Sequence, residues 1–150
     1  MNFDNDFISH SEKETEEFAS QLARHVAPGT VIALHGDLGA GKTVFTRGFA
    51  RGLGIDEPVS SPTYTIIQEY RMTDGGWLFH LDLYRIDDYR AALAFGVEEY
   101  LDDPGAYILA EWPERIAEIM PDNAVHITIT HDGDSERVIK VEGGDVLNDA

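Results

Sequence analysis

The stretch HGDLGAGKTVFTRG, residues 35–48, carries the most informative pattern in this chain. Residues 36–43 fit the phosphate-binding loop pattern G-x-x-x-x-G-K-(S/T) at every position. The glycines allow backbone N–H groups to turn toward phosphate oxygens, and the helix that follows such a loop adds the positive end of its dipole. The pattern therefore predicts that a nucleoside triphosphate binds here, with Lys42 bridging the terminal phosphates and the Thr43 hydroxyl serving as a Mg²⁺ ligand.

The segments on either side of this loop have the composition that the pattern requires. Residues 30–35, TVIALH, form a nearly continuous apolar run, which is typical of a strand buried on both faces of a parallel sheet. After the loop, apolar residues recur at helical spacing at Val44, Phe45, Phe49 and Leu53, and Gly54 follows as the expected C-cap. A strand, a loop and a helix in this order are the context of a phosphate-binding loop.

The rest of the chain alternates helical and extended patterns. Further helices are expected over residues 11–27 (capped by Ser11), 87–103 (interrupted near Gly96) and 113–120. Further strands are expected over residues 63–71, 77–82, 106–111, 124–130 and 137–142. Two pairs of these strands are joined by short turns and must be antiparallel, whereas the strand before the loop is typical of a parallel sheet.

These elements predict an α/β fold, a P-loop NTPase-like three-layer sandwich with a mixed parallel and antiparallel central sheet. A chain of 150 residues corresponds to one domain, and no repeat or linker divides it. We therefore expect a single P-loop ATPase domain over residues 1–150, with residues 143–150 as a frayed tail.

The charge of the chain restricts its partners. There are 28 Asp and Glu residues against 11 Lys and Arg, which gives a net charge of −17. Nucleic-acid binding draws on basic surfaces, so stable direct binding of RNA or DNA is not expected. The charge serves solubility or steers the chain toward a basic protein partner, and both interpretations stay open. Repulsion between like-charged copies favours a monomer outside any larger complex.

The composition also restricts the compartment and the chemistry. The chain has no cysteine, which excludes disulfides, thiolate nucleophiles and zinc–thiolate sites. It has no apolar run of about 18 residues, so no membrane span is expected. The acidic start, MNFDNDFISHSEKETEE, does not have the basic and apolar regions of a secretory signal peptide. A cytoplasmic protein is the expectation.

Two acidic residues stand at the ends of predicted strands. Asp82 ends WLFHLD and Glu111 ends AYILAE. Ligands of open α/β sheets gather at the carboxyl ends of strands, and Mg²⁺ prefers one or two carboxylates together with phosphate oxygens. Each acid alone is also consistent with a helix cap or a solvated loop end. Together with the phosphate-binding loop they indicate a magnesium site.

Other polar and aromatic residues are less informative. Residues 60–63, SSPT, occupy a position that contacts γ-phosphate and Mg²⁺ in P-loop switches, but a simple proline turn explains them equally well. The histidines form no spaced metal-binding pair, and a structural role is the interpretation for each. Trp112 is either part of the core or a conformational lever beside the magnesium site.

The motifs GDLGAGKT, SPTYT, HLDLYR and EWPE follow one another in an order and at separations that resemble one family, the TsaE family. The resemblance covers about residues 9–140. It implies a P-loop domain with a mixed sheet that binds ATP or ADP with Mg²⁺. It also implies partners, the TsaB and TsaD proteins, which transfer a threonylcarbamoyl group to an adenosine of tRNA, with TsaC in the same pathway. ATP hydrolysis would reset that machinery.

The resemblance also implies roles for individual residues. ATP contacts fall on Asp37, Leu38, Gly39, Ala40, Gly41, Lys42, Thr43, Ser11, Glu12 and Arg137. Magnesium ligands fall on Thr43, Glu111 and Asp82. Catalytic roles fall on Asp82, as the acid near the attacking water, and on Thr63, as the switch threonine.

Three other functions are alternatives to an ATPase of this family. A small-molecule kinase needs an arginine-bearing lid, and no such segment is apparent. A GTPase needs the guanine-reading N-K-x-D motif, which the chain does not contain. A nucleotide-gated binding module with negligible turnover stays open, because no arginine finger can be assigned within the chain.

Overall fold

The computed structural model describes residues 3, 5–37, 40–59, 66–133 and 135–143. The strands are β1 (Phe7–Ser9), β2 (Val31–His35), β3 (Ile67–Arg71), β4 (Trp77–Asp82), β5 (Ala106–Glu111), β6 (Val125–Asp132) and β7 (Glu136–Glu142). The helices are α1 (Glu12–His25), α2 (Lys42–Gly52), α3 (Tyr89–Ala94), α4 (Val97–Leu101) and the 3₁₀ helix η1 (Pro113–Ile119).

One seven-stranded sheet runs through the molecule in the order β1-β7-β6-β2-β5-β4-β3. Its centre is parallel: β2 pairs in parallel with β5 and β6, and β5 pairs in parallel with β4. Its edges are antiparallel, since β3 pairs with β4, β7 with β6 and β1 with β7. The predicted mixed α/β sheet is confirmed, and β2 has the buried central position that its apolar run indicated.

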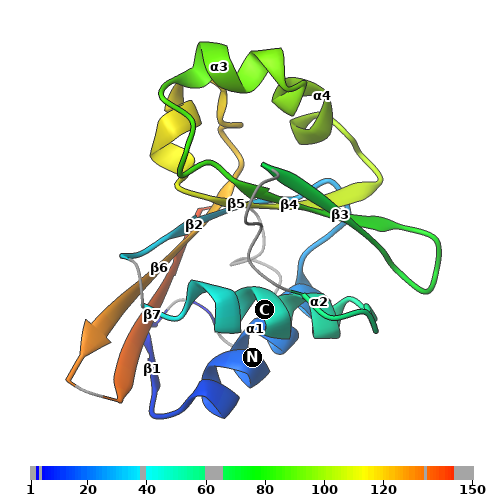
Figure 1. Cartoon of the computed structure of the whole chain (residues 1–150). Coiled ribbons are helices and arrows are strands. Elements are labelled where there is room, and N and C mark those ends of the chain that lie inside the picture. The colour runs from blue at the N-terminus through cyan, green and yellow to red at the C-terminus, as the bar shows by residue number, and fades with distance from the viewer. Residues whose placement is uncertain (1–2, 4, 38–39, 60–65, 134, 144–150) are drawn as a thin grey trace.

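Helices cover both faces of this sheet, which gives three layers (Figure 1). α1 and α2 lie on one face and bury a cluster that includes Leu22, Phe45 and Phe49. α3, α4 and η1 lie on the other face over a second cluster, which includes Leu81 and Ile108. Successive residues along β5 alternate between the two clusters, as the pleat of a sheet requires.

The contact between α1 and α2 depends on a small residue. A Cβ atom at Gly48 would lie 2.3 Å from the backbone oxygen of Glu16, so a larger side chain would force the helices apart. Arg47 and Arg51 of α2 flank the contact and pair with Glu16 of α1. α1 holds α2, and therefore the loop that precedes it, against the sheet.

The ends of the helices carry the residues that the sequence indicated. The Ser11 side chain accepts a hydrogen bond from the Glu14 N–H at the start of α1, and Gly96, at φ 77°, separates α3 from α4.

The first strand, β1, was not predicted, because its three residues show no periodicity of their own. It forms on the edge of β7, which supplies its hydrogen-bonding partner.

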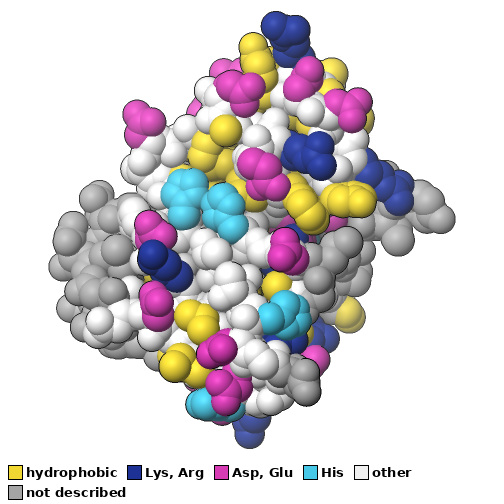
Figure 2. Space-filling view, turned by 90° about the vertical axis from the view of Figure 1, so that its left-hand side faces the viewer, with side chains coloured by type: hydrophobic (Ala, Val, Ile, Leu, Met, Phe, Trp, Pro, Cys, Tyr) yellow, Lys and Arg dark blue, Asp and Glu magenta, His cyan; other side chains and the backbone are white. Residues whose placement is uncertain are grey.

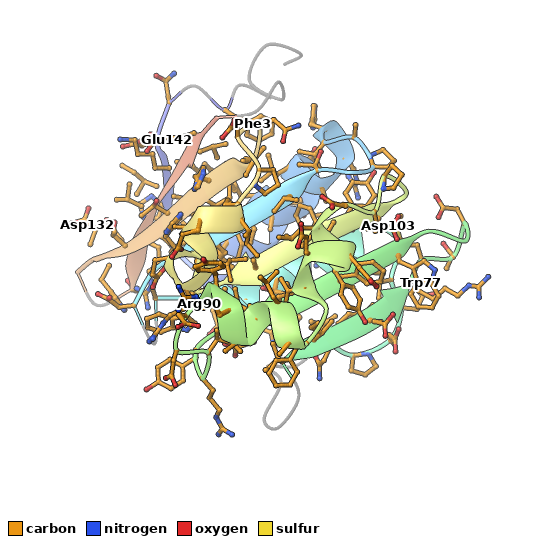
Figure 3. The ribbon with its side chains drawn as sticks, turned by 90° about the horizontal axis from the view of Figure 1, so that it is seen from above. Phe3, Trp77, Arg90, Asp103, Asp132 and Glu142 are labelled. Atoms are coloured by element: carbon orange, nitrogen blue, oxygen red, sulfur yellow. The ribbon has the colours of Figure 1, made fainter. Side chains whose placement is uncertain are left out.

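The carboxyl ends of the parallel strands face one side of the molecule. In Figure 3, Trp77 and Asp103 mark the amino ends of β4 and β5, and Asp132, where β6 ends, lies on the opposite side of the view. The loop after β2, the acid that ends β4 and the acid that ends β5 all emerge at that carboxyl side. This is where ligands bind in open α/β sheets.

Acidic groups dominate the surface. Figure 2 shows acidic side chains scattered across one face, with Lys and Arg side chains lying apart from one another among the described residues. Within the described part of the chain, none of the helices has the length and apolar composition needed to traverse a bilayer.

Candidate functional site

The backbone of the loop after β2 requires glycine at its first position. Gly36 has φ 153°, and a Cβ atom there would lie 2.9 Å from the backbone oxygen of Ile129 in β6. The Ala40 N–H then donates to the Asp37 carbonyl at 3.0 Å, which turns the chain toward α2. Leu38 and Gly39, two of the predicted ATP contacts, lie outside the described residues. The described residues of the loop therefore connect the end of β2 to the start of α2.

Lys42, the first residue of α2, is directed toward the carboxyl end of β5. Its side chain is buried, and its Nζ lies 4.2 Å from the centre of the Trp112 ring. Trp112 directly follows Glu111 and has φ 59°. For a residue other than glycine this conformation costs roughly 1–3 kcal/mol, and such strain clusters at functional sites. The fold thus places the lysine of the loop beside the predicted magnesium ligands.

Arg137 lies against the loop from β7. Its Nε donates to the Ala40 carbonyl at 3.1 Å, which brings this predicted ATP contact to the loop. Ser11 and Glu12 were also predicted to contact ATP, but they have other partners. Ser11 caps α1, and a carboxylate oxygen of Glu12 lies 3.9 Å from Arg47 of α2. Within the described residues, the structure joins Arg137 to the loop but shows no such contact for Ser11 or Glu12.

A cleft of about 650 Å³ opens between the loop, Trp112 and the end of β6. Its size falls in the range of small-ligand sites, roughly 300–1,000 Å³. It is lined by His35, Gly36, Asp37, Ala40, Trp112, Glu114, Thr128, Ile129, Thr130 and His131. The cleft therefore adjoins the loop and Trp112.

The two predicted acids lie side by side. Asp82 of β4 and Glu111 of β5 are partners in the parallel register, so both side chains project from the same face of the sheet. Burial raises the pKa of Asp82 above its ordinary value; the hydrogen bond from the Tyr84 N–H opposes this effect, and the Glu111 carboxylate adds to it. A cation between the two carboxylates would relieve their repulsion.

Glu111 has a partner that the sequence analysis did not identify. Its Oε2 lies 2.6 Å from Nε2 of His80, and both side chains are buried. The sequence contained a usable indication, because His80 stands two residues before Asp82 and so projects from the same face of β4. The structural interpretation given to this histidine overlooked that placement.

The residues present suit magnesium only together with a nucleotide. In the described ranges, no three His, Cys, Asp or Glu side chains cluster closely enough to hold a metal ion by themselves. Two carboxylates, from Asp82 and Glu111, with the Thr43 hydroxyl and phosphate oxygens, match the ligand set that Mg²⁺ prefers. Thr63, the predicted switch threonine, lies outside the described residues.

Asp82→Asn is expected to stabilise the protein. The folded-state pKa of Asp82 is raised, so its ionisation disfavours the folded state at pH 7, and this cost disappears as the pH falls toward 3.8. After allowance for solvent screening, we expect a gain of roughly 0.5–1 kcal/mol, or roughly 1–4 °C in Tm. Thermal unfolding at pH 7 and pH 4 measures it. A gain of the same size at both values would contradict the assignment.

His35, the residue directly before the loop, lies against His126 of β6. Nε2 of His35 is 2.9 Å from Nδ1 of His126, and the two rings are nearly parallel. Burial lowers the pKa of His35 below its ordinary value of 6.5, and His126 lowers it further, while Glu114 and Glu142 act in the opposite direction. One ring must donate and the other accept, so the pair requires at least one neutral ring.

The stability of the protein is therefore expected to fall as the pH drops below about 6.5. A histidine with a lowered folded-state pKa binds fewer protons when folded, so its contribution is present above the unfolded value and is lost toward the folded one. Chemical unfolding measured between pH 7.5 and pH 5 tests this. The double variant His35→Gln, His126→Gln is expected to show a shallower dependence on pH, and an unchanged dependence would argue against the pair as its source.

The chain is similar in sequence to proteins of known name. A family model, Threonylcarbamoyl adenosine biosynthesis protein TsaE, matches residues 9–139. The tRNA threonylcarbamoyladenosine biosynthesis protein TsaE of Bacillus subtilis (strain 168) is 47% identical over 128 residues, which cover 85% of this chain and 78% of that protein. The protein of the same name in Treponema pallidum (strain Nichols) is 35% identical over 136 residues, which cover 89% of this chain and 97% of that protein.

A solved structure has the same architecture. The crystal structure of Bacillus subtilis YdiB matches with a TM-score of 0.76 and 36% sequence identity. The match covers 96% of this chain and 88% of that one. The predicted fold class is confirmed by this likeness together with the observed sheet.

Proposed function

Because the chain belongs to the TsaE family, we propose that it is a Mg²⁺-dependent ATPase of the threonylcarbamoyladenosine modification of tRNA, acting on a complex of TsaB and TsaD. The observation that carries the proposal is the meeting of Lys42 with the segment that holds Glu111. A loop lysine and two strand-end carboxylates come together at the carboxyl edge of one sheet, beside an open cleft.

Each group has a chemical role in this proposal. Lys42 and the backbone N–H groups of the loop would bind the phosphates of ATP, and Arg137 would support the loop from β7. Thr43, Asp82 and Glu111 would hold Mg²⁺, which neutralises charge on the phosphates when it is bound. The Asp82 carboxylate would also orient the attacking water and accept its proton. Thr63 would sense the γ-phosphate.

The proposal extends to the setting in which the chain works. It would form one domain over residues 1–150, act in the cytoplasm and be a monomer outside the complex. A net charge of −17 disfavours both self-association and direct binding of tRNA, so the partners would hold the nucleic acid.

Nucleotide binding and product analysis test the proposed function. The full chain is titrated with ATP and with ADP, with Mg²⁺ and with EDTA, and its products are then analysed. We expect tighter binding with Mg²⁺ and release of free phosphate when TsaB and TsaD are present. A phosphorylated small molecule in place of free phosphate would indicate a kinase. Binding without turnover, even with both partners, would indicate a nucleotide-gated binding module.

A further inference from the structure

His80 and Glu111 form a buried, hydrogen-bonded pair beneath the candidate site. We propose that His80 is a positioning residue that fixes the carboxylate of Glu111 for a divalent cation. This inference rests on the proposed function, in which Glu111 is a magnesium ligand. It assigns a task to a histidine that neither binds the nucleotide nor contacts the cation in that proposal.

The geometry of the pair is that of a strong hydrogen bond. His80 Nε2 and Glu111 Oε2 are 2.6 Å apart, and the residues are 1% and 5% exposed. They come from adjacent parallel strands, β4 and β5, in which His80 lies opposite Leu109 and Glu111 lies opposite Asp82. Alternation along the strands therefore directs all three polar side chains to the face that α2 covers.

The burial of the imidazole defines how its proton is placed. Within the described residues, Nδ1 of His80 is buried and has no hydrogen-bond partner. The N–H of a ring with one proton is satisfied on Nε2, which faces a carboxylate oxygen, and would be buried and unpaired on Nδ1. The imidazole therefore donates from Nε2 to Glu111.

This hydrogen bond leaves Glu111 with further acceptor sites for a ligand. Oε2 accepts from His80, which restricts the rotation of the carboxylate, and Oε1 has no such partner from His80 and is available to a cation. A buried side chain with a fixed direction binds a cation without first losing conformational freedom. Partners of this kind orient metal ligands, and their loss typically weakens metal affinity about tenfold to a hundredfold.

A matched pair of substitutions tests the role of His80. His80→Gln keeps an N–H near the position of Nε2, whereas His80→Asn is also polar but too short to reach Glu111. Binding of Mn²⁺, which shares the oxygen ligands of Mg²⁺, is followed by electron paramagnetic resonance in the presence of ADP. We expect His80→Asn to bind Mn²⁺ roughly tenfold to a hundredfold more weakly, and His80→Gln to bind it nearly as well as the wild type.

The affinity for ADP measured in EDTA, without the cation, distinguishes a positioning role of His80 from a general structural role. We expect this affinity to be unchanged in both His80 variants. The inference is overturned if His80→Asn binds Mn²⁺ as the wild type does, or if it loses affinity for ADP equally with and without the cation. A wild-type chain that binds ADP with no dependence on Mn²⁺ would instead overturn the proposed function, and this inference with it.

Two further measurements do not depend on one variant. In a Glu111→Gln background, His80→Asn should cause no additional loss of Mn²⁺ affinity, because the two residues act through one carboxylate; an additional loss of the full size overturns the inference. In the wild-type protein, ¹⁵N NMR of the imidazole should show a protonated Nε2. The opposite tautomer overturns it even if the variants fail to fold.

Discussion

TsaB and TsaD together are expected to raise the rate of ATP hydrolysis by this chain by roughly 10³–10⁵, the range that an arginine supplied in trans typically gives. Three arginines of α2 and β7 already have partners. Arg137 donates to the Ala40 carbonyl, and Arg47 and Arg51 pair with Glu16 of α1. The isolated chain should therefore bind ATP and hydrolyse it slowly, because we assign none of the guanidinium groups in the described residues to the charge that develops on the γ-phosphate.

Release of phosphate measures this effect directly. The assay compares the chain alone, the chain with each partner and the chain with both partners. The partners with the Lys42→Ala chain are the control for contaminating ATPase activity. If the isolated chain turned over ATP at its full rate and the partners added nothing, the arrangement proposed above would be wrong.

Lys42→Ala is expected to reduce hydrolysis in the presence of both partners by at least about 100-fold. Lys42 is buried at the start of α2, where its ammonium adds to the positive end of the helix dipole. Its replacement removes the one side-chain charge that the loop pattern directs at the terminal phosphates. Affinity for ATP, measured by calorimetry, is expected to fall with it.

The matched control is Lys140→Ala, which makes the same change of charge on an exposed residue of β7 that pairs with Glu142. Lys140→Ala is expected to keep its affinity for ATP and its rate of hydrolysis. Thermal unfolding of both variants shows whether each is folded. Unchanged hydrolysis in a folded Lys42→Ala chain would refute the assignment of residues 36–43 as the phosphate-binding loop.

The elements that surround the loop could be predicted because their patterns are local. The apolar run before the loop became β2, the helical stripe after it became α2, and the short turns gave the two antiparallel pairs. β1 could not be predicted, because its three residues form a strand only on the edge that β7 provides. The family resemblance, drawn from four separated motifs, is confirmed over residues 9–139.

Part of the candidate site could likewise be predicted from local patterns, and part could not. The loop, Asp82 and Glu111 could be proposed from the sequence, since a glycine-rich pattern and an acid at a strand end are visible in the order of residues. The predicted positions of Leu38, Gly39 and Thr63 lie outside the described residues and stay predictions. The partners of these groups were not visible, because each comes from a distant part of the chain.

The sequence by itself determined which residues fit a phosphate-binding pattern and which strands end in acids, because backbone freedom and side-chain alternation are properties of neighbouring residues. Only the tertiary structure decided that Lys42 lies over Trp112, that Arg137 supports the loop and that His80 holds Glu111. Those contacts depend on the order of strands in the sheet and on the register between β4 and β5. Both are set by how the whole chain buries its apolar faces, which no short stretch of sequence specifies.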